Sequence, residues 1–329
     1  MNRYFEKDID PTPILDRRVT VVGYGNQGRA HALNMRDSGL KVQVGSREGK
    51  GRNLAVEDGF EPQPLAEAVQ QADMIVLTVP DETMSQVFED HIQSNMQDEA
   101  TLVFAHGFAL TYGLVEPRAG GAVLVSPSGP GTAVRLSYTQ GEGVPAFFAA
   151  EPQSNRGLAL AYGWAIGSAR AGLLETTFQE ETECDLFGEQ VVLCGGMPEL
   201  AIAAFETLVD SGYSPEVAYT ECVQQVRLLA ELMALYGVAG MKQRISDTAE
   251  WGAYLNGPKL IDDSVRERMG LILRSIQNKS FAMGWMEEAS KGKQRLAKFR
   301  DEAAGSLNED VFRKLTVRPD RHGPSGDRV

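Results

Sequence analysis

Two carboxylates, Asp185 and Glu189, stand four residues apart in a run that is unusually rich in acids, residues 180–190 (EETECDLFGEQ). If this run is helical, both side chains lie on one face of the helix. The apolar segment that follows, residues 191–196, indicates that the helix borders a protein interior, where an uncompensated carboxylate is costly. A divalent cation with oxygen ligands would neutralise the pair. The alternative is a solvated acidic helix start, since acids are favoured in a first turn.

A glycine-rich turn near the N-terminus predicts a phosphate site. Residues 19–23 (VTVVG) read as a buried strand that runs directly into the turn GYGNQG at 23–28, and residues 29–36 read as a helix. Gly23 permits the tight turn, Gly25 lets a pyrophosphate approach the backbone, and Gly28 lets helix and strand pack closely. The N-terminus of the helix attracts the phosphate charge. The alternative is a similar turn that binds nothing.

The next predicted strand, residues 41–45, runs into a turn with a hydroxyl and three cations: Ser46, Arg47, Lys50 and Arg52. A site for NAD usually carries an acid here that binds the ribose 2′-hydroxyl. Basic residues suit a 2′-phosphate instead, so the sequence predicts NADPH. A solvated loop of mixed charge is the alternative.

Further apolar runs at residues 74–80, 100–105 and 122–125 alternate with helical segments, which predicts a doubly wound parallel sheet of the Rossmann type. The segment Asp81–Met84 follows one strand end, and His106 follows the next. The carboxyl ends of such strands carry ligands and titrating groups. The loop at residues 126–131 (SPSGPG) is rigid enough to shape a cleft floor.

From about residue 182 strand-like runs disappear, and residues 201–211, 215–236 and 263–300 read as helices. The sequence therefore predicts a Rossmann domain at residues 1–181, an all-α domain at 182–315 and a disordered tail at 316–329. Glu221 and Gln225 form a second pair four residues apart. The pair is either part of a site or a solvated polar stripe on a helix. Residues 245–252 (ISDTAEWG) read as a polar turn between helices.

Composition excludes several classes of partner. The 329 residues carry a formal net charge of −13, which argues against nucleic acid and anionic membranes. The N-terminus has no signal-peptide pattern, and no stretch approaches the roughly 18 apolar residues of a membrane span. The three cysteines are far apart and read as free thiols of a reducing cytoplasm.

Together these residues resemble the ketol-acid reductoisomerase family, in its short form, from about Tyr4 to Leu315. The motifs that carry the resemblance lie at residues 23–39, 105–108 (AHGF), 175–196, 205–221 and 245–252. The resemblance implies an NADPH-binding domain, a knotted helical domain that dimerises, and two magnesium ions in the active site. Family members move an alkyl group between neighbouring carbons of a 2-hydroxy-3-keto acid and then reduce the resulting 2-keto acid.

Family roles can be transferred where residues match. The resemblance makes Asp185, Glu189 and Glu221 metal ligands and Ser246 the binder of the substrate carboxylate. It also makes His106, the active-site histidine, and Glu221 catalytic residues. It also places a group of residues at the cofactor: Gly23, Tyr24, Gly25, Asn26, Gln27, Gly28, Ser46, Arg47, Lys50, Arg52, Asp81, Glu82, Thr83, Met84 and Gly131.

Two substrate-side positions depart from the family pattern. Gln225 stands where a second glutamate is usual, and Ser128 where a lysine precedes Gly-Pro-Gly. Migration requires deprotonation of an alcohol and polarisation of a carbonyl, which two metal ions accomplish together. Hydride transfer requires mainly a placed nicotinamide and a proton source. The substitutions should therefore weaken migration more than reduction.

We therefore expect a cytoplasmic, homodimeric NADPH-dependent reductase of a small carbonyl- or imine-type substrate in a specialised pathway. One alternative is a complete ketol-acid reductoisomerase that converts acetolactate to dihydroxyisovalerate. The other is a non-catalytic dinucleotide-binding dimer, for which an acidic cluster would have no use.

Overall fold

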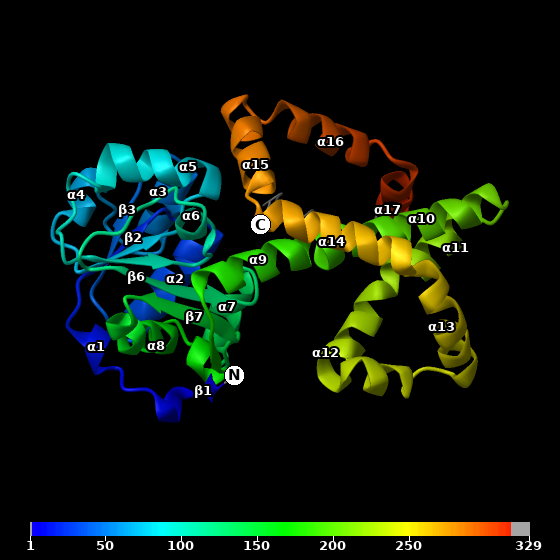
Figure 1. Ribbon diagram of the computed structural model, residues 1–329, viewed down its shortest axis with the longest axis horizontal. Coiled ribbons are helices and arrows are strands. Elements are labelled where there is room, and N and C mark those ends of the chain that lie inside the picture. The colour runs from blue at the N-terminus through cyan, green and yellow to red at the C-terminus, as the bar shows by residue number, and fades with distance from the viewer. Residues whose placement is uncertain (1, 317–329) are drawn as a thin grey trace. The chain divides into compact units, whose positions relative to one another are not determined.

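The computed structural model describes residues 2–316 and divides into two units, one that ends at Thr182 and one that begins at Glu183 (Figure 1). The predicted tail lies outside the described residues from 317 onward, and its first residue, Thr316, ends a helix.

The first unit is built on an eight-stranded sheet in the order β1-β8-β7-β6-β5-β4-β2-β3. β3, β2, β4, β5 and β6 are parallel, which confirms the predicted doubly wound Rossmann-type core. The sheet is mixed at its other end, because β7 runs antiparallel to β6 and β1 antiparallel to β8. The strands are β1 Arg3–Tyr4, β2 Val19–Val22, β3 Val42–Gly45, β4 Met74–Leu77, β5 Thr101–Phe104, β6 Ala122–Pro127, β7 Ala146–Glu151 and β8 Leu173–Glu175.

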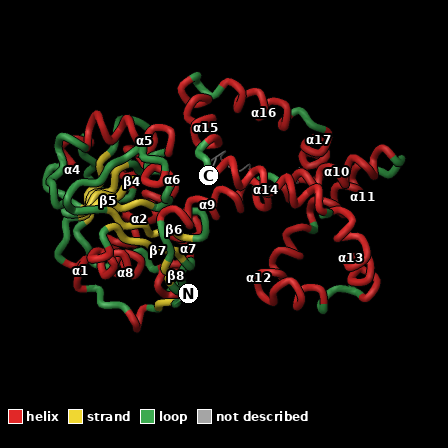
Figure 2. Tube along the Cα trace, in the orientation of Figure 1, coloured by secondary structure: helices red, strands yellow, loops and turns green. Residues whose placement is uncertain are grey.

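Helices cover both faces of this sheet (Figure 2). Alternate strand residues point to opposite faces, so Val19 and Val21 join one buried core while Val22 joins the other. The first core is covered by α1 Thr12–Leu15, α2 Asn26–Asp37, α3 Lys50–Glu57 and α8 Arg156–Ala165, with α7 Gly131–Thr139 against α2. The second is covered by α4 Leu65–Val69, α5 Asp81–Val87, the π-helical η2 Phe88–Ile92 and α6 Phe108–Thr111. Short 3₁₀ turns are η1 Glu6–Asp8, η3 Gln153–Asn155 and η4 Ser168–Arg170.

The strand register places three loops side by side at the carboxyl edge of the sheet. Val22 is aligned with Gly45 on one side and with Leu77 on the other. Gly23, Ser46 and Thr78 therefore follow neighbouring strand ends. The chain passes from β2 to β3 on one side of β2 and then crosses to β4 on the other side. The carboxyl ends of β2 and β4 therefore form the topological switch point, where such sheets bind ligands.

In the described part of the second unit, helices joined by short turns are the regular secondary structure. Its small buried core consists of Phe205, Ala218, Tyr219 and Val311. The predicted helix at 263–300 is broken twice, because Lys279 and Lys293 adopt left-handed φ angles of 67° and 59°. The helices are α9 Phe178–Gly188 (which begins in the first unit), α10 Gly196–Asp210, α11 Pro215–Tyr219, α12 Val226–Lys242, α13 Asp247–Leu260, α14 Asp263–Gln277, α15 Ser280–Ser290, α16 Gln294–Ala304 and α17 Leu307–Thr316.

Two π-helical turns interrupt these helices, η5 Glu189–Leu193 and η6 Thr220–Gln224. In η5 the Cys194 amide donates to the Glu189 carbonyl at 2.8 Å, one residue beyond the α-helical partner. A Cβ on Gly195 or Gly196 would lie 2.0 Å from the carbonyl oxygen of Gln190 or Val191. The glycine pair therefore makes this turn possible. The predicted helix at 215–236 is similarly divided by η6.

The expectation about membrane spans is corrected by one helical run. Phe178–Asp210, 33 residues long, is long and apolar enough to cross a membrane by length and composition. Only 6% of its apolar window is buried within the chain. An exposed apolar helix face of this kind is also what a protein–protein interface presents.

Candidate active site

The glycine turn is shaped by close backbone packing. Gly23 has a φ of +91°, and a Cβ on Gly28 would lie 2.3 Å from the Gly23 carbonyl oxygen and 2.5 Å from Thr78 Oγ1. The Thr78 hydroxyl lies 3.0 Å from the carbonyl oxygens of both Val22 and Gly23, which fixes the turn to β4. Gly25, by contrast, has no atom within 4 Å of its Cβ position. The N-terminus of α2 therefore has room above it for a pyrophosphate.

The loop after β6 is tied to this turn. Asn26 Oδ1 accepts from the Thr132 amide at 3.0 Å, and Gln27 Nε2 donates to the Gly129 carbonyl at 3.0 Å. Gly131 must be glycine, because its Cβ would lie 2.1 Å from the Asn26 carbonyl oxygen. Gln27 Oε1 is buried without a hydrogen-bond partner among the described residues, so it can accept from a bound ligand.

The basic turn lies at the end of β3. Arg47 and Lys50 are exposed, and Ser46 Oγ is buried with no partner in the described part of the chain. Arg52 contacts the Ser46 carbonyl at 3.4 Å and forms an ion pair with Glu48 at 3.2 Å. An unpaired buried hydroxyl beside exposed cations fits the ribose phosphate of a dinucleotide. The donor set of the turn therefore fits the predicted cofactor.

His106, which follows β5 by two residues, is held by a carboxylate. Its Nδ1 lies 3.1 Å from Glu181 Oε1, and the Gly107 amide donates to Glu181 Oε2 at 2.8 Å. The Glu181 side chain is 2% exposed. Gly107 is required here, since a Cβ would lie 2.4 Å from Thr182 Oγ1. The arrangement orients the imidazole ring and stabilises a positive charge on it.

Sequence reasoning assigned no role to Glu181, although a signal was present. Glu181, Asp185 and Glu189 recur at intervals of four, so they share one helical face. The first of them is the one that is buried, whereas Asp185 and Glu189 are exposed. The histidine and the glycine of the AHGF motif are thus the two residues that contact the buried Glu181 carboxylate.

The segment Asp81–Met84 forms the first turn of α5. Asp81, Glu82 and Thr83 are partly exposed, and Thr83 Oγ1 donates back to the Pro80 carbonyl at 3.0 Å. The Met84 side chain is 4% exposed and lies in the second core, so it packs beneath this turn. Ser128 is exposed in the loop after β6, where its amide donates to the Pro145 carbonyl at 2.8 Å.

The predicted metal ligands are not assembled into one set by this chain. No group of three or more His, Cys, Asp or Glu side chains among the described residues is placed to hold a metal ion. Asp185 and Glu189 do offer two carboxylates from one helix face. Mg²⁺ commonly takes one or two carboxylates and retains several waters, so this pair fits a hydrated Mg²⁺.

Glu221 and Gln225 are joined by a hydrogen bond in which Gln225 Nε2 donates to Glu221 Oε2 at 2.7 Å. Ser246 is the N-cap of α13, and its Oγ accepts from the Ala249 amide at 3.3 Å. The predicted polar turn at 245–252 therefore ends at Ser246, and the remainder is helical. The N-cap role accounts structurally for this serine.

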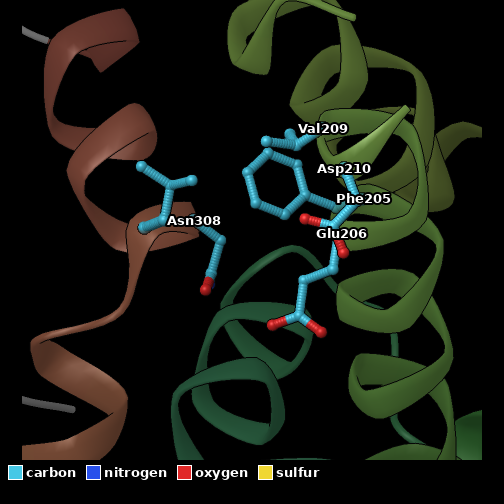
Figure 3. Close-up of a pocket in the computed structure, with 6 residues that line it drawn as sticks. Phe205, Glu206, Val209, Asp210 and Asn308 are labelled. Carbon is cyan, nitrogen blue, oxygen red and sulfur yellow. The ribbon is translucent and has the colours of Figure 1, made fainter. Parts of the chain in front are cut away.

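One hollow in the second unit contains none of the predicted site residues (Figure 3). α10 and α17 line it with Phe205, Glu206, Val209, Asp210, Leu307 and Asn308. It joins an apolar floor to two exposed carboxylates and includes no cationic group.

A Rossmann-type sheet with a glycine turn, a basic turn and a carboxylate-held histidine at one edge is the architecture of a nicotinamide-dependent oxidoreductase. Residues 13–172 match the family described as acetohydroxy acid isomeroreductase, NADPH-binding domain, and residues 178–319 match ketol-acid reductoisomerase, C-terminal domain. The chain belongs to the ketol-acid reductoisomerase family, and its NAD(P)H-dependent oxidoreductase class is thereby confirmed.

Solved structures agree with this assignment. An NADH-preferring ketol-acid reductoisomerase from an uncultured archean is 36% identical, with 97% of this chain and 100% of that one covered and a TM-score of 0.92. A semialdehyde dehydrogenase NAD-binding protein from Cupriavidus necator is 18% identical, with 80% and 99% covered and a TM-score of 0.61. A pyrroline-5-carboxylate reductase from Coxiella burnetii is 16% identical, with 81% and 98% covered and a TM-score of 0.53. The last two share the fold alone.

Proposed function

We propose that this protein reduces a small 2-keto acid with NADPH and that its alkyl-migration activity is weak. The observation that carries the proposal is the buried Glu181 carboxylate, which holds both the His106 ring and the Gly107 amide at the edge where the cofactor turns lie. Reduction transfers hydride from the dihydronicotinamide to the keto carbon and a proton to the keto oxygen. With Nδ1 engaged by Glu181, His106 supplies that proton from Nε2.

The preference for NADPH over NADH rests on the basic turn. Arg47 and Lys50 are exposed at the start of α3, and the Ser46 hydroxyl is buried without a partner in the described chain. Charge-assisted bonds to a 2′-phosphate would use all three. Titration of nicotinamide fluorescence should give a lower Kd for NADPH than for NADH, and equal values would overturn this preference.

Mg²⁺ belongs to the proposal through Asp185 and Glu189, with water, substrate or a second copy providing the remaining ligands. When bound, Mg²⁺ polarises the substrate oxygens. The two carboxylates would hold the ion. Calorimetric titration should detect Mg²⁺ binding to the wild type and not to Asp185→Asn.

The weakness of migration is inferred from Gln225 and Ser128. Gln225 keeps an amide on Glu221, so it supplies a neutral group where a second negative charge would bind a cation. Ser128 leaves the exposed loop without a cation at that position. The decisive test follows NADPH oxidation with acetolactate and, separately, with 3-hydroxy-2-ketoisovalerate, which requires no migration. Activity on the second compound alone supports the proposal.

The second candidate is a complete ketol-acid reductoisomerase, in which Gln225 and Ser128 are tolerated. The match to a ketol-acid reductoisomerase over 97% of this chain favours it. Comparable turnover of both compounds would establish this candidate. NADPH binding without turnover of either would point to the non-catalytic dinucleotide-binding dimer.

We also propose a cytoplasmic homodimer. The second unit leaves large apolar side chains exposed: Leu235 is 73% exposed, Met283 70% and Trp251 68%. Such surface is costly in water and suits a second copy. The free cysteines Cys184, Cys194 and Cys222 suit a reducing compartment. Sedimentation analysis should give twice the mass of the chain, and a monomer would contradict the dimer.

A further inference from the structure

Asp58, the C-cap residue of α3, is bound by several side chains at once. Its carboxylate accepts from Arg29 Nε at 2.7 Å, from Arg29 Nη2 at 2.9 Å and from the Tyr24 hydroxyl at 2.9 Å. Its carbonyl accepts from Arg36 Nη1 at 2.6 Å. A fork-shaped guanidinium paired with a carboxylate fixes geometry as well as charge. The end of α3 is therefore held firmly to α2, which carries both arginines.

Tyr24 connects both ends of α3 to the glycine turn. Its hydroxyl reaches Asp58 at the last turn of the helix, and its carbonyl packs against Gly51 at the first turn, where a Cβ would lie only 3.0 Å away. The Tyr24 ring is 4% exposed and meets Phe60 edge-on with 5.7 Å between centroids. A helix of eight residues held at both ends has little freedom to rotate or slide.

The other end of α3 carries the cations of the basic turn. Lys50 is its first residue, and Arg52 reaches back to the Ser46 carbonyl and to Glu48. The position of α3 thus determines where these cations lie relative to the glycine turn. The contacts of Asp58 in turn determine the position of α3.

We propose that Arg29 and Asp58 are positioning residues that set the preference for a 2′-phosphorylated dinucleotide, although neither touches it. This inference depends on the proposed role of the basic turn in binding the 2′-phosphate. The pair acts through α3, by holding Lys50 and Arg52 at the correct distance from the pyrophosphate turn. A purely structural pair would affect stability but would not change the choice between NADPH and NADH.

The chain offers a matched control at the amino-terminal ends of the strands, away from the glycine turn. Arg18, just before β2, donates from Nε and Nη2 to Asp73, just before β4, at 3.0 and 2.9 Å. The side chains of this pair are 48% and 24% exposed, against 45% and 15% for Arg29 and Asp58. The two pairs therefore match in chemistry and exposure but not in location.

The experiment measures the Kd of NADPH and of NADH by fluorescence titration, together with the melting temperature. Its variants are Asp58→Asn, Arg29→Ala, Tyr24→Phe, and the controls Asp73→Asn and Arg18→Ala. The Kd ratio of NADH to NADPH should fall about tenfold in Asp58→Asn and Arg29→Ala, the equivalent of one lost charge-assisted bond to phosphate. Tyr24→Phe, which removes one hydroxyl, should shift it in the same direction. Arg29→Lys, which keeps the charge but loses the two-nitrogen fork, should restore only part of the ratio.

The controls should leave the ratio within about twofold while lowering the melting temperature to a similar extent. An unchanged ratio in Asp58→Asn and Arg29→Ala would reduce the pair to a structural contact and overturn the inference. A wild type without preference for NADPH would instead show that the proposed 2′-phosphate site is wrong, and the inference would fall with it.

Discussion

A buried histidine makes the stability of the first unit sensitive to mild acid. His31 of α2 and Tyr162 of α8 are both fully buried, and His31 Nδ1 lies 2.8 Å from the Tyr162 hydroxyl. His31 Nε2 is buried without a hydrogen-bond partner in the described part of the chain. Protonation of the ring would place an unpaired cation between helix α2 and the core beneath it.

Burial lowers the pKa of His31 from 6.5 to about 4. Above pH 6.5 the ring is neutral in both the folded and the unfolded chain, and the folded state keeps its full stability. Between pH 6.5 and 4 only the unfolded chain takes up the proton, so stability falls by up to ~1.4 kcal/mol per pH unit. The total loss is about 3 kcal/mol, and it is complete once the pH is below the folded pKa.

The assay is calorimetric unfolding of the wild type and of His31→Gln from pH 7.5 to 4. Glutamine can keep a hydrogen bond to Tyr162 and does not titrate. In the variant, the free energy of unfolding should therefore lose the part of its pH dependence that comes from His31. The free energies of the two proteins should converge by about 3 kcal/mol as the pH falls. His91→Gln, which replaces a half-buried histidine of η2, serves as the control for loss of a histidine elsewhere in the first unit. Parallel curves for His31→Gln and the wild type would refute the reasoning.

Three further predictions follow from the site. Glu181→Gln should lower kcat for reduction of 3-hydroxy-2-ketoisovalerate roughly 10- to 100-fold and leave the Kd of NADPH unchanged, because the ring of His106 loses its charged partner; an equal change in both would indicate general disruption. Gly28→Ala should raise the Kd of NADPH by about tenfold or more, because its Cβ would meet the Gly23 carbonyl, and an unchanged titration curve would contradict this. Asp185→Asn should abolish the stabilisation by Mg²⁺, about 2.7 kcal/mol at a hundredfold excess over Kd, as read from thermal shift; a persistent shift would place the ion elsewhere.

The first half of the fold was predictable because its signals are local. The run VTVVG before a glycine turn, and the apolar runs that follow it, predict strands whose order the doubly wound rule then constrains. The antiparallel β7 carries a weaker signal, since its sequence AFFAAE shows no regular alternation of apolar and polar residues. Its pairing with β6 depends on tertiary contacts, because the helix α7 separates the two strands in the sequence.

The site was predictable in part. His106 was recognisable from its place after a strand, whereas its partner Glu181 lies 75 residues further along, and only the folded chain brings the two together. The predicted metal ligands show the opposite limit. Spacing predicts the shared face of Asp185 and Glu189, but it contains no information on where Glu221 lies. The helix breaks at Lys279 and Lys293 were missed because lysine rarely adopts a positive φ.

The π turn η5 has a consequence for the helix that contains it. Relative to an α-helix it accommodates one additional residue, which rotates everything beyond it by about 100°. The acidic side chains up to Glu189 and the core side chains from about Phe205 therefore point in directions, around the helix axis, that an uninterrupted α-helix would not give. Deleting a single residue within 190–194 would restore the α-helical pitch and turn Phe205 out of its core. The rotation introduced by η5, rather than any one contact, therefore sets the direction of the acidic face relative to the face that packs into the core.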